Sequence, residues 1–152
     1  MSLESVREDL ARKAPDIAII KHELSTATVM DAALAHGCEP GQIAKTLSLR
    51  LGDKVVLLVA RGDARLDNKK ARVALGAKPR MLDITEVEAI TGHPVGGVSP
   101  FGLASDLQIY CDISLKSFAE VIPAAGDRNS SLRIAPDRLA ALVNATWVDA
   151  CE

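Results

Sequence analysis

The sequence predicts an α+β fold in which helices pack on a mixed, mostly antiparallel β-sheet, and three observations support this class. Segments with the apolar spacing of helices alternate with short apolar runs typical of strands. A tight hairpin signal, Gly52-Asp53, separates two such runs near the middle of the chain. Several later strand-like segments are joined by connections too short for parallel crossovers. Because 152 residues suit one core and no repeat or linker appears, we expect a single domain over residues 1–152.

A first helix is expected near the start of the chain. Four apolar residues recur there at helical spacing: Leu3, Val6, Leu10 and Ala14. Ser2 is a candidate N-cap, since its hydroxyl oxygen can accept a free backbone N–H, and Pro15 ends the pattern. Residues 16–22, which are rich in isoleucine, then predict a short strand.

A cluster of hydroxyls, Ser25-Thr26-Ala27-Thr28, precedes a second helical pattern that ends at Gly37. The pattern rests on three apolar residues: Met30, Ala33 and Leu34. The hydroxyls have two open roles, because short polar side chains at this place can either cap the helix or bind a ligand.

Residues 43–51 and 54–61 predict two strands joined by Gly52-Asp53, a dipeptide typical of a two-residue hairpin turn. The second strand is apolar on both faces over residues 55–60. A strand that is covered on both faces lies inside a sheet, so we expect this strand to be central.

Two short helices are expected next. Asp67 is a candidate cap for the first, whose apolar positions fall within residues 71–75 and which stops at Gly76. Thr85-Glu86-Val87-Glu88 fits a capping box that opens the second helix, and Gly92 ends it.

Three strands and a last helix complete the expected elements. Residues 107–113, 121–125 and 132–134 have strand patterns. Pro136 suits the first turn of a helix that continues through Val143, because proline lacks the N–H that this turn leaves unbonded.

The composition, 48% hydrophobic and 25% charged, is ordinary for a soluble globular protein. No apolar run approaches the roughly 18 residues of a membrane helix, and the first residues lack a secretory signal pattern, so a cytoplasmic protein is expected. Cys38, Cys111 and Cys151 are odd in number and widely spaced, which favours free thiols over disulfides or a zinc site. We expect no metal and no cofactor.

Positive charge is concentrated in one segment although the net charge is −2. Residues 61–80 hold seven basic and two acidic side chains; the basic ones are Arg61, Arg65, Lys69, Lys70, Arg72, Lys78 and Arg80. Such a run forms either a patch that faces phosphate groups or a solvated helix face.

Residues 91–102 hold four glycines and two prolines and predict a shaped loop. Glycines allow close approach of the backbone and prolines stiffen turns, so successive N–H groups can be aimed at an oxygen-rich ligand. A double turn that closes a sheet is the alternative interpretation.

Lys45 lies inside an apolar strand pattern and shares one face with Ile43, Leu47 and Leu49. A cation among apolar neighbours either extends to solvent or serves a polar site with an anionic partner. Lys45 is therefore a candidate functional residue.

Other polar residues give weaker signals. His93 can act as an acid or base near neutral pH, although an isolated histidine beside a proline is more often structural. Ser99 is not in a nucleophile elbow, and no Ser, His and Asp set is evident from spacing. Asp112 and Asp127 are expected to serve as turn or cap residues.

Several motifs together resemble the YbaK/EbsC family, stand-alone relatives of the editing domain of bacterial prolyl-tRNA synthetase. They are Ile43-Ala44-Lys45-Thr46-Leu47, the segment 62–76, Gly92, and Gly96-Gly97-Val98-Ser99-Pro100-Phe101-Gly102. The resemblance extends over nearly the whole chain. It implies an α+β fold and hydrolysis, in trans, of the ester between a wrong amino acid and its tRNA.

The resemblance also implies site residues. Lys45 matches the family's functional lysine, near the terminal nucleotide and the scissile ester, with Thr46 beside it. The loop that holds the aminoacyl group matches Gly96, Gly97, Val98, Ser99, Pro100, Phe101 and Gly102, with His93 before it. Thr26, Thr28 and Met30 are further pocket candidates. The implied partners are the aminoacylated 3′ end of tRNA and an aminoacyl-tRNA synthetase, with no membrane.

Three functions therefore compete. The first is a deacylase that removes a small amino acid, alanine, cysteine, serine or threonine, from tRNA; backbone N–H groups and Lys45 suit a developing oxyanion. The second is a non-catalytic module that binds tRNA ends, nucleotides or a synthetase. The third, a small-molecule esterase, is disfavoured by the missing nucleophile elbow.

Overall fold

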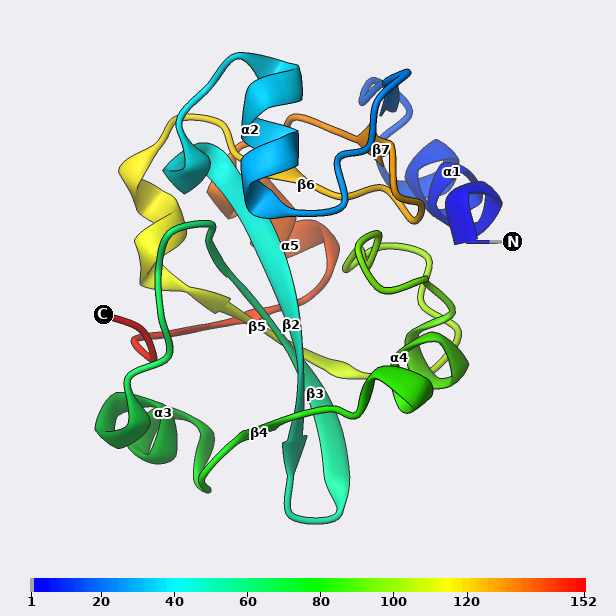
Figure 1. Ribbon diagram of the computed structural model, residues 1–152. Helices are drawn as coiled ribbons and strands as arrows, with labels where there is room; N and C mark the ends of the chain where they lie inside the picture. Colours follow the sequence, from blue (N-terminus) through cyan, green and yellow to red (C-terminus); the bar gives the residue numbers. More distant parts are fainter. Residues whose placement is uncertain (1) are drawn as a thin grey trace.

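The computed structural model describes residues 2–152, and a six-stranded mixed sheet forms its centre (Figure 1). The strand order is β4-β2-β3-β5-β8, with β6 also on β2. These strands are β2 (Ile43–Leu51), β3 (Lys54–Arg61), β4 (Arg80–Met81), β5 (Gln108–Asp112), β6 (Ile122–Pro123) and β8 (Thr146–Val148). Outside the sheet, β1 (Ile20–Lys21) pairs with β7 (Ser130–Ser131).

The sheet is mixed as expected, and the α+β class is confirmed. The β1–β7, β2–β3 and β2–β4 pairs are antiparallel. The β2–β6, β3–β5 and β5–β8 pairs are parallel. Antiparallel pairing is thus less dominant than expected, because β5 joins β3 from far along the chain and β8 joins β5 after a helical connection.

Helices surround the sheet (Figure 1). They are α1 (Ser2–Lys13), α2 (Val29–His36), α3 (Asn68–Leu75), α4 (Ile84–Thr91) and α5 (Pro136–Leu142), with short 3₁₀ turns η1 (Pro40–Gln42) and η2 (Ile113–Ser117). The helices α2, α3 and α4 each end at a left-handed glycine: Gly37, Gly76 and Gly92. In the described part of the chain, every helix is too short or too polar to cross a membrane.

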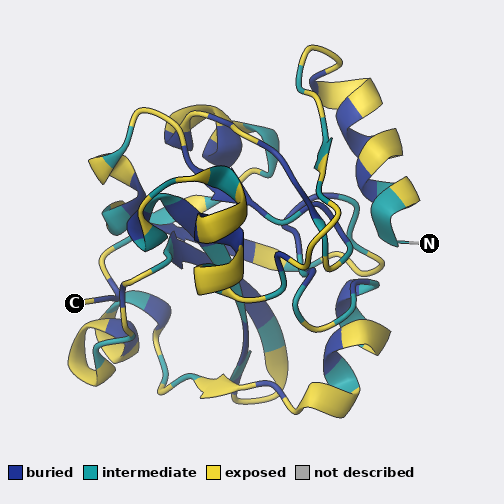
Figure 2. Cartoon of the chain, turned by 45° about the horizontal axis from the view of Figure 1, so that its top comes forward, coloured by how far each residue is buried: buried dark blue, intermediate teal, exposed yellow. Residues whose placement is uncertain are grey.

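Two apolar cores cover the two faces of the sheet, and β3 lies between them. One core joins α1 and α5 to alternate sheet residues, among them Leu57 and Val59. The other joins α3 to Val56, Leu58 and Ala60. Residues 56–60 of β3 are all fully buried, which confirms β3 as a central strand. In Figure 2, most exposed residues lie on outer helix faces and in loops, and others lie at strand ends and on the edge strand β4.

Two predicted helix starts are wrong. Ser2 lies within α1, and its hydroxyl donates a hydrogen bond to the carbonyl of Gly126, so it does not act as the cap. The second helix after the hairpin begins at Ile84, where Asp83 is the cap and accepts a bond from the N–H of Thr85. Asp83 is at least as good a capping residue as Thr85, so the helix begins earlier than the expected capping box placed it.

Candidate active site

A cavity of about 250 Å³ opens beside the first half of β2. Its wall comes from segments far apart in the sequence: the start of α2, β2, the β4–α4 region, the glycine-rich loop 91–102, and residues 122–131. Cavity walls built from several segments are typical of ligand sites, because each segment can supply a separately placed group.

The cavity lies at a gap along one edge of β2. On one edge, β2 pairs with β3 over residues 44–51. On the other, it pairs with β6 at residues 43–44 and with β4 at residues 49–50. The carbonyl of Ser48 accepts a bond from the N–H of Leu82 at 2.9 Å. Within the described chain, residues 45–47 therefore have no strand partner on this edge, where a ligand can approach the backbone.

Lys45 is half-buried at the rim of this cavity, and its ammonium donates a hydrogen bond to the carbonyl of Ala64. Burial lowers the pKa of Lys45 from its usual value, and the charge of Arg65 acts in the same direction, against Cys151 and Asp63. An ammonium carries three donors, so the bond to Ala64 leaves donors for an oxygen of a ligand.

Thr46 and Ser48 place hydroxyls in the cavity wall from the next positions of β2. The hydroxyl of Thr46 is buried and has no hydrogen-bond partner within the described chain. Leaving a buried polar group unpaired costs about 1–3 kcal/mol, a cost that a ligand with a matching group removes. Thr46 thus has the property of a ligand-binding residue.

The glycine-rich loop contributes part of its length to the cavity. Gly96 and Val98 line it, together with Val95. The loop is held from outside, since Arg128 donates a bond from Nε to the carbonyl of Val95 at 2.9 Å. Gly97 packs against the segment that contains Asp127 and Arg128: a Cβ on Gly97 would lie 2.6 Å from the carbonyl of Asp127.

The other predicted loop residues lie behind the cavity wall. His93, Ser99 and Phe101 are completely buried. The ring of His93 donates from Nε2 to the carbonyl of Phe101 at 2.8 Å, and the Ser99 hydroxyl accepts from the N–H of Phe101 at 3.3 Å. Burial lowers the pKa of His93, partly offset by its bond to Phe101. His93, Ser99 and Phe101 therefore support the loop from the core and do not line the cavity.

Pro100 and Gly102 face away from the cavity, toward a groove beside α1. The N–H of Gly102 donates to Asp9 at 2.9 Å, and a Cβ on Gly102 would lie 2.5 Å from the backbone of Ser5. The close packing of this backbone against α1 explains why residue 102 is a glycine. Of the seven loop residues predicted to hold the aminoacyl group, Gly96 and Val98 are the two that the structure brings to the cavity.

One of the hydroxyls before α2 has the expected capping role, and two of them line the cavity. Thr28 caps α2, accepting a bond from the N–H of Asp31 at 3.0 Å, and it also lines the cavity. Thr26 lines the cavity too, and its hydroxyl bonds to the carbonyl of Arg128 at 3.3 Å. Met30 does not line the cavity: its side chain is 61% exposed, so the prediction that it forms part of the pocket is wrong.

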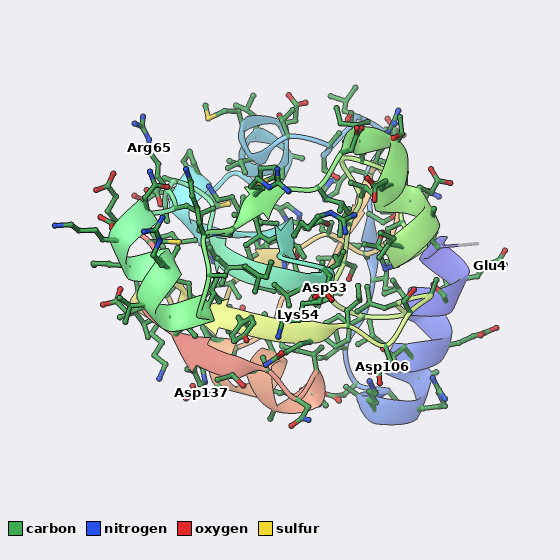
Figure 3. All side chains as sticks on the ribbon, turned by 90° about the horizontal axis from the view of Figure 1, so that it is seen from below. Glu4, Asp53, Lys54, Arg65, Asp106 and Asp137 are labelled. Atoms are coloured by element: carbon green, nitrogen blue, oxygen red, sulfur yellow. The ribbon has the colours of Figure 1, made fainter. Side chains whose placement is uncertain are left out.

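Two of the basic side chains of residues 61–80 form ion pairs. Arg61 forms an ion pair with Asp63 at 2.6 Å, and Lys70 pairs with Asp149 at 3.3 Å. Arg65 is exposed and extends from the ribbon into solvent (Figure 3). Its positive charge lowers the pKa of Lys45 slightly.

Two predicted capping or turn acids have those roles. Asp112 caps η2, accepting from the N–H of Ser114 at 3.0 Å, and Asp127 accepts from the N–H of Asn129 at 3.0 Å. Burial raises the pKa of the Cys111 and Cys151 thiols to about 12, so both stay protonated at neutral pH and make poor nucleophiles.

The wall of the cavity combines hydroxyl groups and one cation with apolar side chains. It has Lys45 as its cation, no carboxylate among its described residues, and five hydroxyls from Thr26, Thr28, Thr46, Ser48 and Ser131. Sequence reasoning did not find Ser48 or Ser131. The apolar strand pattern conceals Ser48, and Ser131 belongs to a two-residue strand that periodicity does not reveal.

Comparison with known proteins gives the family. A model of the aminoacyl-tRNA editing domain matches residues 23–142. The chain is 46% identical over 154 residues to the protein YwhH of Bacillus subtilis, an alignment that covers 100% of this chain and 98% of YwhH.

Two further relatives carry descriptions of function. EbsC of Enterococcus faecalis, named as a candidate Cys-tRNA(Pro)/Cys-tRNA(Cys) deacylase, is 34% identical over 116 residues, which cover 74% of this chain and 70% of EbsC. A crystal structure described as a candidate trans-editing enzyme for prolyl tRNA synthetase superposes with a TM-score of 0.91 and 33% identity, over 99% of this chain and 97% of that one. The chain therefore belongs to the aminoacyl-tRNA editing domain family.

Proposed function

We propose that residues 1–152 act as one editing domain that hydrolyses, in trans, the ester bond of a tRNA mischarged with a small amino acid. The observation that carries the proposal is the cavity beside the open edge of β2, with Lys45 at its rim and the unpaired hydroxyl of Thr46 in its wall. The family model and the names of the relatives support the same reaction class.

Lys45 is the residue we expect to act on the tRNA end. Its ammonium is anchored by the carbonyl of Ala64 and keeps donors free, so it can bind a phosphate or the oxygen of the scissile ester. A cation positioned at that oxygen stabilises the negative charge that develops as water attacks the carbonyl carbon. The loop backbone at Gly96 and Val98 is expected to hold the aminoacyl group opposite it.

The size of the cavity favours a small amino acid. A volume of about 250 Å³ suits the side chain of alanine, cysteine, serine or threonine together with part of a ribose, and the tight backbone contacts behind Gly96 and Gly97 leave little room for expansion. Synthetases discriminate poorly between such side chains, since one methylene changes binding by about 1–3 kcal/mol. A second hydrolytic site removes the errors that result.

The test is a deacylation time course of the purified protein with tRNAs charged with alanine, cysteine, serine, threonine or proline. We expect rapid hydrolysis of one or two small-residue esters and slow hydrolysis of prolyl-tRNA. Lys45→Ala should lower the rate by about 100-fold or more, as removal of one charge-stabilising donor does elsewhere. Lys54→Ala is the matched control, because Lys54 is exposed at the hairpin, away from the cavity (Figure 3).

The other outcomes select the competing functions. Unchanged turnover by Lys45→Ala would remove Lys45 from the mechanism. If the wild-type protein hydrolyses none of the charged tRNAs, the non-catalytic module that binds tRNA ends becomes the better description, and the affinity for uncharged tRNA would test it. Hydrolysis of simple aminoacyl esters at the same rate as tRNA would favour a small-molecule esterase. Adding prolyl-tRNA synthetase to the assay tests the expected synthetase partner through a lower KM.

A further inference from the structure

Ser131, a residue of the cavity wall, meets two histidines, His36 and His22. Ser131 lines the cavity, is 2% exposed, and has its hydroxyl oxygen 2.6 Å from Nε2 of His36. Nε2 of His22 lies 3.2 Å from the same nitrogen, and the two rings meet edge to face. The three residues come from β7, the last turn of α2, and the segment after β1.

Backbone bonds hold this cluster in place. Ser131 pairs with Ile20 in the β1–β7 ladder. Just beyond β1, the N–H of His22 donates to the carbonyl of Asn129 at 2.8 Å, and the side chain of Asn129 donates to the carbonyl of His22 at 2.8 Å. The rigid support favours a role that needs fixed distances between the side chains.

The protonation state of His36 decides the direction of its bond to Ser131. Burial lowers the pKa of His36, and the charges of His22 and Arg133, from the segments after β1 and β7, act in the same direction. The ring is therefore neutral at pH 7. If Nε2 carries its lone pair, the Ser131 hydroxyl donates to it and turns its own lone pairs toward the cavity.

Ser131 is also placed near the expected position of the ester. It lies opposite Ala124 in a β-bridge, and Pro123 pairs with Ala44, the neighbour of Lys45. Two strand spacings, about 10 Å, thus separate the backbone at Ser131 from that of β2. Both Lys45 and Ser131 line the cavity, so an aminoacyl group bound there would lie between β2 and β7.

We propose that Ser131 and His36 form a catalytic dyad that accepts the proton of the attacking water, and that His22 acts on His36 through its charge. This inference rests on the proposed hydrolysis. The water oxygen bonds to the ester carbonyl carbon while the proton of the water passes to Ser131 Oγ and the proton of Ser131 passes to His36 Nε2. When the bond between that carbon and the ribose oxygen breaks, the same proton returns through Ser131 to the ribose oxygen.

Two nitrogens 3.2 Å apart could also bind a metal ion. The positive charge of Arg133 near His36 and the absence of a carboxylate among the described residues of the cavity wall favour the proton relay. The experiment therefore includes a chelator.

The test compares pH–rate profiles of the wild-type protein, Ser131→Ala, His36→Gln and His22→Gln on the tRNA ester that the wild type hydrolyses. Ser131→Ala and His36→Gln should lower kcat by about 100-fold or more with little change in KM, as loss of general-base catalysis does. His36→Gln should also lose the acid limb of the profile. His22→Gln should move that limb to higher pH, because it removes a positive neighbour of His36. Ser130→Ala is the matched control, as Ser130 does not line the cavity.

Several results would overturn the dyad. Full activity of Ser131→Ala beside an active wild type would reject it while leaving the proposed function intact, whereas an inactive wild type would reject both. A covalent acyl adduct on Ser131, detected by mass spectrometry, would make Ser131 the nucleophile instead. Loss of activity in EDTA, restored by zinc, would make the cluster a metal site. Nitrogen-15 NMR of His36 checks the dyad without turnover: a protonated Nε2 at pH 7.5 contradicts it.

Discussion

At Gly97 the glycine-rich loop has no room for a side chain. A Cβ there would lie 2.6 Å from both the carbonyl carbon and the carbonyl oxygen of Asp127, which are backbone atoms that cannot rotate away. Gly97→Ala should therefore displace the loop, at a cost of about 1–3 kcal/mol in the free energy of unfolding. Because Gly96 and Val98 on either side line the cavity, kcat/KM for deacylation should fall as well.

Gly52→Ala separates the two effects. Gly52 has φ of 61° at the tip of the β2–β3 hairpin, with open space around it. Alanine there is strained by about 1 kcal/mol, so stability should fall while deacylation stays unchanged. Chemical denaturation and the deacylation assay, run on both variants, decide the matter. If Gly97→Ala kept full activity, the loop would be a passive turn.

The place of a single residue could be predicted from the sequence where the residue breaks a local pattern. Lys45 interrupts an apolar strand, so its place at the cavity rim could be expected. Ser131 and His36 could not be found, since their contact spans 95 positions and depends on a two-residue strand. His93 lies in a notable loop, but its contact with the Phe101 carbonyl inside the core is set by packing that no spacing reveals.

The helix α2 links capping directly to the site. Its cap, Thr28, accepts the N–H of Asp31, lines the cavity, and starts the helix whose last residue is His36. Thr28→Ala should destabilise the protein by about 1 kcal/mol, lowering Tm by about 2–4 °C, because a helix N–H loses its acceptor. Activity should fall as the start of the helix loosens against the cavity.

Thr28→Ser is the matched variant, since it keeps the capping oxygen and removes a methyl group. It should retain most of the stability that Thr28→Ala loses. Thermal unfolding of the two variants measures this difference. Equal destabilisation by both would show that the methyl group of Thr28, and not its cap bond, stabilises α2.

Elements with strong local signals agree with their predictions. The β2–β3 hairpin and the ends of α2, α3 and α4 follow from a turn dipeptide and from glycines after helical patterns. The strands β4 and β8 were not predicted, because each has at most three residues and exists through pairing with a longer strand. Short strands of this kind depend on tertiary contacts that sequence periodicity does not carry.

At the scale of the whole molecule, stability should depend on pH through His93. This ring is fully buried, and burial lowers its pKa below the value of about 6.5 that it has when unfolded. Below pH 6.5 the unfolded chain therefore binds a proton that the folded chain does not, so stability is full above this pH and is lost as the pH falls toward the folded pKa. His36 contributes with the same sign.

Urea unfolding of the wild-type protein at pH 7.5 and 5.5 measures this dependence. The midpoint should fall at pH 5.5, and it should fall less in His93→Gln, whose side-chain amide can still donate to the Phe101 carbonyl. Equal shifts in both proteins would show that His93 does not cause the change.

Asp112, the last residue of β5, connects the sheet to the segment that holds Lys45. Its buried carboxylate accepts the N–H of Ser114 and, at 2.8 Å, that of Ala150. The carbonyl of Ala150 in turn accepts the N–H of Asp67, in the segment whose Ala64 carbonyl anchors Lys45. The position of Lys45 thus depends on a chain of bonds that begins at β5.

Replacing this carboxylate should affect both stability and activity. Asp112→Ala leaves two backbone N–H groups without an acceptor, at about 1–3 kcal/mol each, so the free energy of unfolding should fall by about 2–5 kcal/mol. Asp112→Asn keeps one acceptor oxygen and should lose less. Asp106→Ala, at an exposed carboxylate, is the control (Figure 3).

Deacylation, measured at a temperature where Asp112→Asn is fully folded, distinguishes a remote support from a merely stabilising residue. If these hydrogen bonds position Lys45, kcat should fall in the folded variant while KM changes little. The ester still binds, but Lys45 stabilises the negative charge of the transition state less well. Wild-type kcat in the folded variant would confine Asp112 to stability and leave the Ala64 carbonyl as an anchor that needs no help from β5.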